Sequence, residues 1–171
     1  CPVGTLLDQG VRIAEQHGGK VLSSRVSEPD FEAGDKKGTG GGSQWKDSFL
    51  LAPYLRDTFV ACGVLSETFE TAITWDRFEE FHADVMSTAR RVVAEVCGVS
   101  PDGEGAPRIS CRLTHVYPDG AAPYFTVLAP ARRGGEVEQW DEIKAAVSEA
   151  LIEGGGTITH HHAVGRDHRP W

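Results

Sequence analysis

The order of periodic segments from Leu65 onward most constrains the fold of this 171-residue sequence. Apolar residues recur at the helical spacing in two long segments, and they alternate or cluster with β-formers in the others. The segments are a strand at 65–73, a helix at 74–97, strands at 109–117 and 124–129, a helix at 139–153 and a strand at 157–163. This β-α-β-β-α-β order predicts an α+β fold of the ferredoxin-like split βαβ type, an antiparallel sheet with its helices on one face.

The residues before this pattern predict less regular structure. A helix is expected from Thr5 to His17, and a short strand is expected at 20–24. The polar stretch 25–48 predicts a mobile loop, and its glycine-rich part Gly38–Ser43 lacks the Lys-Ser/Thr pair of a phosphate-binding loop. Pro53 suits the first position of a short helix that ends near Cys62.

Composition excludes several classes of protein. The net charge of −8, from 25 acids and 17 bases, argues against nucleic-acid binding. No apolar run approaches the roughly 20 residues of a membrane span, and no secretory signal opens the chain. The four cysteines are widely spaced, which predicts reduced thiols in an intracellular protein. Because the chain begins at Cys1 and its one methionine is Met86, we expect 1–171 to be a single-domain fragment of a longer protein.

Three consecutive histidines, His160, His161 and His162, form the most distinctive motif. On the predicted strand, His160 and His162 share one face while His161 points to the other. That alternation makes a poor first shell for one ion, so no metal site is predicted. Imidazoles grouped after a glycine turn favour acid/base chemistry, with a polar strand end as the alternative.

Two further features admit a functional and a structural interpretation. His115, Tyr117 and Tyr124 flank the turn Pro118-Asp119-Gly120, where a tyrosine either packs or directs its phenol at a reacting atom. Alternation places His115 on the face opposite Arg112. Arg56 beside an aspartate is either a surface pair or a guanidinium that holds a phosphate, a carboxylate or a flavin carbonyl.

The sequence resembles the C-terminal domain of alkyldihydroxyacetonephosphate synthases and of bacterial FAD-linked oxidases. The matching segments follow the family order at similar spacing over nearly the whole chain, with the triple-histidine block as the most specific. They are Ala52–Asp57, Glu67–Ala72, Thr74–Arg77, Ser110–Thr114, Tyr124–Phe125 and Gly155–Gly165.

The resemblance implies a cap domain whose own N-terminal FAD-binding domain is absent from this sequence. In these synthases a fatty alcohol replaces the acyl group of acyl-dihydroxyacetone phosphate, through a covalent flavin adduct and without net redox change. By the same resemblance, Tyr124, His161 and Arg56 are expected to be catalytic. Substrate or cofactor binding is expected of His160, His162, Arg112 and His115.

An FAD-linked oxidoreductase acting on a hydroxy acid or an alcohol is the alternative function. A binding module without chemistry is disfavoured, because titratable residues gather at strand ends. Related D-2-hydroxy-acid dehydrogenases carry a metal-binding His-x-Gly-Asp-Gly-Asn-x-His segment, and the second histidine is missing from the stretch that begins at His115. The expected partners are a lipid or hydroxy-acid substrate, the FAD domain and, in a homodimer, a second copy. The expected location is the cytoplasm, or the peroxisome in a eukaryote.

Overall fold

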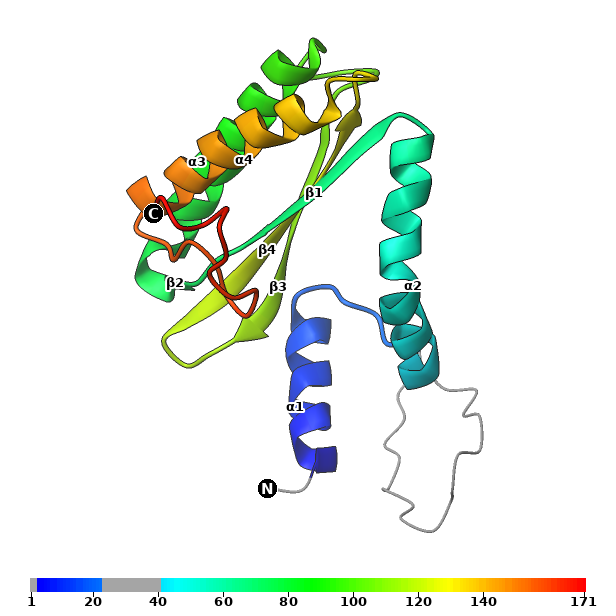
Figure 1. Ribbon diagram of the computed structural model, residues 1–171. Coiled ribbons are helices and arrows are strands. Elements are labelled where there is room, and N and C mark those ends of the chain that lie inside the picture. Colours follow the sequence, from blue (N-terminus) through cyan, green and yellow to red (C-terminus); the bar gives the residue numbers. More distant parts are fainter. Residues whose placement is uncertain (1–2, 23–40) are drawn as a thin grey trace. The chain divides into compact units, whose positions relative to one another are not determined.

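The computed structural model describes residues 3–22 and 41–171, and the chain divides into two compact units, Cys1–Lys46 and Asp47–Trp171. The first unit contains helix α1, Val3–Gln16 (blue in Figure 1), close to the predicted bounds. The predicted strand at 20–24 is not formed at 20–22, and its last two residues lie outside the described part of the chain.

Helix α2, Gly41–Ala61, is longer than the predicted helix and carries Pro53 in its interior. A proline lacks the N–H that an interior helical residue donates. For this reason the sequence predicted that a helix begins at Pro53. The loop predicted over 25–48 is therefore wrong for 41–48, and residues 25–40 lie outside the described ranges. The glycine-rich stretch is divided in the same way, because its last three residues open α2.

The second unit is built on an antiparallel sheet whose central strand is β4, Gly120–Pro130. On one side β4 pairs with β1, Val64–Glu70, and with the short β2, Ile73–Thr74. On its other side β4 pairs with β3, Arg108–Val116. Strand β4 thus lies between β1 and β3, which are joined through a helix, and this is the split βαβ arrangement that was predicted.

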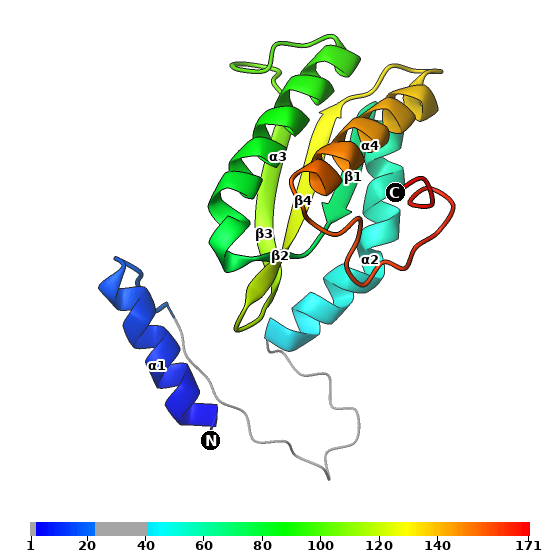
Figure 2. The same cartoon turned by 90° about the vertical axis from the view of Figure 1, so that its left-hand side faces the viewer.

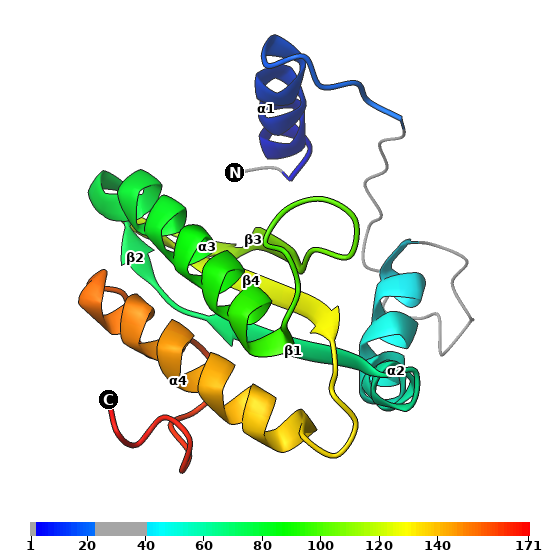
Figure 3. The same ribbon diagram turned by 90° about the horizontal axis from the view of Figure 1, so that it is seen from above.

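Helices α3, Trp75–Cys97, and α4, Glu136–Glu153, lie side by side on one face of this sheet (Figures 1 and 3). Helix α3 ends at Gly98, whose φ of 67° gives the left-handed C-cap that glycine adopts without strain. The apolar stripes of both helices meet alternate residues of β1 and β4 in one core. Its fully buried members include Val85, Val93, Phe125, Val127, Ile143, Val147 and Leu151.

The α+β class with helices on one face is confirmed, but the predicted last strand is wrong. Residues 157–163 form no strand. Thr157 bonds to Thr71 and Ala72 beside the end of β1, as the predicted last strand would begin to do. The extension then stops because His161 and Ala163 have φ values of 66° and 55°, in the left-handed region. The segment after α4 therefore curls back near the β2 end of the sheet (Figure 2).

The structure bears on two expectations drawn from composition, the lack of a membrane span and the presence of reduced thiols. Among the helices of the described residues, none is both long and apolar enough to cross a bilayer. Cys62, Cys97 and Cys111 are free thiols, of which Cys62 is exposed and the other two are half-buried. Burial raises the pKa of both Cys97 and Cys111 above the ordinary thiol value.

Candidate functional site

A row of three polar residues crosses the sheet on the face opposite the helices. Glu70 of β1 pairs with Tyr124 of β4, which pairs with Arg112 of β3. The preceding row contains Phe69 and Phe125, which are buried under α3 and α4, so this row points the other way. The Arg112 guanidinium carbon lies 4.5 Å from the centre of the Tyr124 ring, in a cation–π contact.

A β-bulge adds His115 to the same face. The register of β3 against β4 shifts between Leu113 and His115, so that His115 lies opposite Ala122. A bulge contributes one extra residue, which re-aims the side chains that follow it. The alternation predicted from sequence, with His115 on the face opposite Arg112, is therefore wrong at this point. Thr114, inside the bulge, donates its hydroxyl to Glu70 Oε1 at 2.5 Å and lies beside Nδ1 of His115.

The segment after α4 brings the histidine block to Glu70. His162 Nε2 lies 3.2 Å from Glu70 Oε2, and His160 Nδ1 lies 3.6 Å from Glu70 Oε1. His115 Nδ1 is 4.0 Å from that same oxygen. The His162 ring also meets the Tyr124 ring edge-on, with centroids 5.9 Å apart. A nearly inaccessible carboxylate, whose side chain is 4% exposed, thus contacts three imidazoles.

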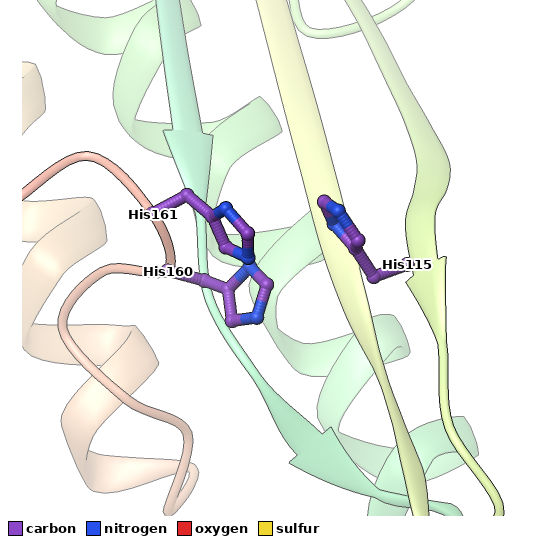
Figure 4. A group of neighbouring side chains, drawn as sticks. All are labelled: His115, His160 and His161. Atoms are coloured by element: carbon purple, nitrogen blue, oxygen red, sulfur yellow. The ribbon is translucent and has the colours of Figure 1, made fainter.

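His115, His160 and His161 form a compact group that we call the imidazole triad (Figure 4). The His115 and His161 rings stack with centroids 4.4 Å apart, and the His160 and His161 rings are 4.1 Å apart. Tyr117, beyond the end of β3, places its hydroxyl 3.2 Å from His160 Nε2. The prediction that His161 points away from His160 is wrong, because the segment is not a strand and His161 has a left-handed φ.

Sequence reasoning missed Glu70, the residue on which the site is organised. A carboxylate so deeply buried must be matched by donors, and Thr114 and His162 are in position to supply them. The sequence contains a signal for this residue, because Glu70 is an acidic residue, a type that is depleted in strands, and it lies at the end of β1.

Arg56, predicted to act with these residues, lies elsewhere in the second unit. Its Nη2 is 3.2 Å from Glu67 Oε2. Glu67 pairs with Val127 in a helix-facing row and accepts hydrogen bonds from Trp140 and Lys144 of α4. Among the contacts of residues 47–171, none joins Arg56 to Tyr124 or to the histidines. The structure therefore brings together six of the seven predicted site residues and leaves Arg56 apart.

Comparison with known proteins identifies the family of the chain. Residues 35–171 match the family described as FAD linked oxidases, C-terminal domain. The chain is 35% identical over 144 residues to an alkyldihydroxyacetonephosphate synthase of Caenorhabditis elegans, and 27% identical over 134 residues to one of Trypanosoma brucei brucei. Each match covers 78% of this chain, which spans about a fifth of these relatives, 22% and 21% of their lengths.

Solved structures show the same fold. A structure of alkyldihydroxyacetonephosphate synthase superposes with a TM-score of 0.55 at 19% identity, over 68% of this chain and 20% of that one. A second structure of such a synthase gives 0.50 at 16% identity, over 70% and 20%. The family match covers well over half of the sequence and agrees with the α+β fold. This chain therefore belongs to the FAD-linked oxidase C-terminal domain family.

Proposed function

We propose that this chain is the C-terminal cap domain of a longer flavoprotein that resembles alkyldihydroxyacetonephosphate synthase. The full-length enzyme would exchange the acyl group of acyl-dihydroxyacetone phosphate for a fatty alcohol, forming an ether bond and releasing a fatty acid. One observation carries the proposal: Tyr124, Arg112 and four histidines converge around buried Glu70 on one face of the sheet. The names of the relatives, alkyldihydroxyacetonephosphate synthases, support this choice of substrate class.

The residues suit proton transfer next to a carbonyl group. His161 is exposed and touches the other triad rings through one stacked and one tilted ring contact, which leaves its ring nitrogens available to a substrate proton. Tyr124 offers a phenol on the same face, and the guanidinium of Arg112 lies against its ring. A phenol, imidazoles and a guanidinium are donors that stabilise negative charge as it develops on an oxygen.

Glu70 would position the imidazoles rather than react. Its carboxylate contacts His160 and His162 and accepts a hydrogen bond from Thr114, so it joins β1 both to β3 and to the segment after α4. A buried orienting group of this kind holds catalytic side chains close to the productive geometry.

The donors on this face also fit the polar edge of a flavin ring, which would belong to the N-terminal domain. Arg112, Tyr124 and His162 are the residues that would meet it, since they lie together on the exposed side of the sheet. Bound FAD would supply the reacting ring and undergo no net change of redox state. We expect the isolated chain neither to catalyse the reaction nor to bind FAD tightly.

Mass spectrometry of the full-length protein's product tests this proposal. With acyl-dihydroxyacetone phosphate and an isotope-labelled fatty alcohol, we expect the label in an ether lipid. Tyr124→Phe and His161→Ala should each reduce turnover by about 10²-fold or more, the usual contribution of a general acid or base. The exposed Glu79→Gln change on α3 is the matched control. Flavin reduction by a hydroxy acid without ether product would instead support the oxidoreductase, and wild-type turnover in both variants would refute the residue roles.

A further inference from the structure

We propose that the imidazole triad binds a divalent transition-metal ion, with Zn²⁺ as the expected occupant. His115, His160 and His161 each offer one ring nitrogen, and these three atoms lie within 4.8 Å of one another. The rings come from β3 and from the segment after α4, and Figure 4 shows them converging. Tetrahedral zinc with Zn–N bonds of about 2.0–2.1 Å requires nitrogens about 3.3 Å apart. The widest nitrogen pair must therefore close by about 1.5 Å, from 4.8 Å to about 3.3 Å.

The rings have room for this adjustment. The His115 side chain is 42% exposed, and His161 is an exposed residue. Among the described residues, His161 makes ring contacts with His115 and His160 but no side-chain hydrogen bond. Rotation about the side-chain bonds of His115 and His161 would therefore disturb ring contacts and the 3.3 Å contact of His115 Nδ1 with Thr114 Oγ1, and it would leave the sheet unchanged.

Glu70 would become the second shell of such a site once the rings move closer to it. Metal-ligating histidines usually donate their other ring N–H to a carboxylate, which fixes the tautomer and the ring orientation. The Nδ1 atoms of His160 and His115 lie 3.6 and 4.0 Å from Glu70 Oε1, which is longer than a hydrogen bond, and the buried Nδ1 of His160 has no hydrogen-bond partner among the described residues. That direction leaves Nε2 of each ring for the ion. His160 Nε2 contacts the Tyr117 hydroxyl at 3.2 Å, and ligation would replace this contact.

The donor set selects the class of ion. Imidazole nitrogen suits Zn²⁺, Cu²⁺ and Ni²⁺, whereas Mg²⁺ and Ca²⁺ require oxygen ligands. Three histidines leave a fourth tetrahedral position for water, as in catalytic zinc sites. The exposure of His115 and His161 places that position toward solvent. The inference goes beyond the proposed synthase function and does not depend on it, because metal binding is measured on this chain alone.

Equilibrium dialysis of the chelator-treated chain against ZnCl₂, together with Co²⁺ absorption spectra, tests the proposal. We expect one ion per chain. His115→Ala and His161→Ala should each weaken binding by at least about tenfold, since even second-shell changes cost about 10–100-fold in affinity. His17→Ala, an exposed histidine of the first unit, is the matched control and should bind as the wild type does. Thermal unfolding establishes that each variant is folded.

Two results would overturn the inference. In the first, folded His115→Ala and His161→Ala both bind Zn²⁺ with wild-type affinity. In the second, the cobalt spectrum shows a thiolate charge-transfer band, which would assign the ion to cysteine. Neither result bears on ether-lipid synthesis by the full-length enzyme, so the two proposals can fail separately.

Discussion

The replacement Glu70→Gln tests the organisation of the site most directly. Glutamine keeps one carbonyl oxygen for the Thr114 hydroxyl, which donates at 2.5 Å, but it places an amide or a neutral oxygen opposite His162, 3.2 Å away. Hydrogen bonds to charged groups contribute about 1.5–3 kcal/mol each, and one such interaction is lost. Relief of the buried charge offsets part of this loss. We therefore expect the free energy of unfolding to fall by about 2 kcal/mol.

Urea denaturation measures this change. With a slope of about 2 kcal/mol/M, the midpoint should move down by about 1 M at an unchanged slope. Glu79→Gln, on the exposed face of α3, removes a charge of the same kind and should change stability by less than about 0.5 kcal/mol. If Glu70→Gln unfolds at or above the wild-type midpoint, the carboxylate makes no net contribution, and its role as the organising group of the site is refuted.

Three further predictions concern packing, thiol chemistry and metal inhibition. Gly156→Ala should lower stability by about 1–3 kcal/mol by urea denaturation, because its Cβ would lie 2.7 Å from Thr71 Oγ1 and 2.8 Å from the Phe81 ring. Gly165→Ala is the control and should leave stability unchanged, because no atom lies within 4 Å of the added Cβ. Burial raises the pKa values of Cys97 and Cys111, so at pH 8 their alkylation should be slower than that of exposed Cys62. The alkylation rate of both half-buried thiols should still increase above pH 9, and peptide mass spectrometry measures these rates. The contribution of these two thiols to the free energy of unfolding is complete below the pKa of an unfolded thiol. It is lost as the pH rises through their raised pKa in the folded protein. Excess Zn²⁺ should inhibit the full-length enzyme reversibly, with EDTA restoring turnover, because a ligating imidazole cannot accept a proton.

The regular elements could be predicted because their signals are local. The apolar spacing of α3 and its terminal glycine defined that helix almost to the residue. The alternation on both sides of Pro118-Asp119-Gly120 gave the hairpin of β3 and β4. These signals predict the structure correctly because burying one face of a helix or strand stabilises the same apolar periodicity that the sequence shows.

Arg56 and Pro53 show where local rules fail. Proline at the first helical turn is the common case, yet α2 continues through Pro53. Arg56 was grouped with the catalytic residues by resemblance. In the second unit its guanidinium instead pairs with Glu67, a buried carboxylate that also accepts from Lys144 and Trp140. A carboxylate with partners on both α2 and α4 cannot be recognised until β1 and α4 are known to be neighbours.

Sequence reasoning named six of the residues that gather around Glu70, but it missed Glu70 and the geometry of the site, and the geometry depends on two backbone irregularities. A single extra residue between Leu113 and His115 turns His115 onto the Glu70 face, and nothing in the alternating sequence marks the bulge. Left-handed φ values at His161 and Ala163 end the extended segment, so that consecutive histidines converge where a strand would separate them. Positive φ at a residue other than glycine costs energy and persists where the surroundings determine it. Here the contacts of His160 and His162 with Glu70 hold the segment on both sides of His161. The strain and the buried carboxylate are thus two parts of one arrangement, and that arrangement makes His161 the residue for which proton transfer and metal binding would compete.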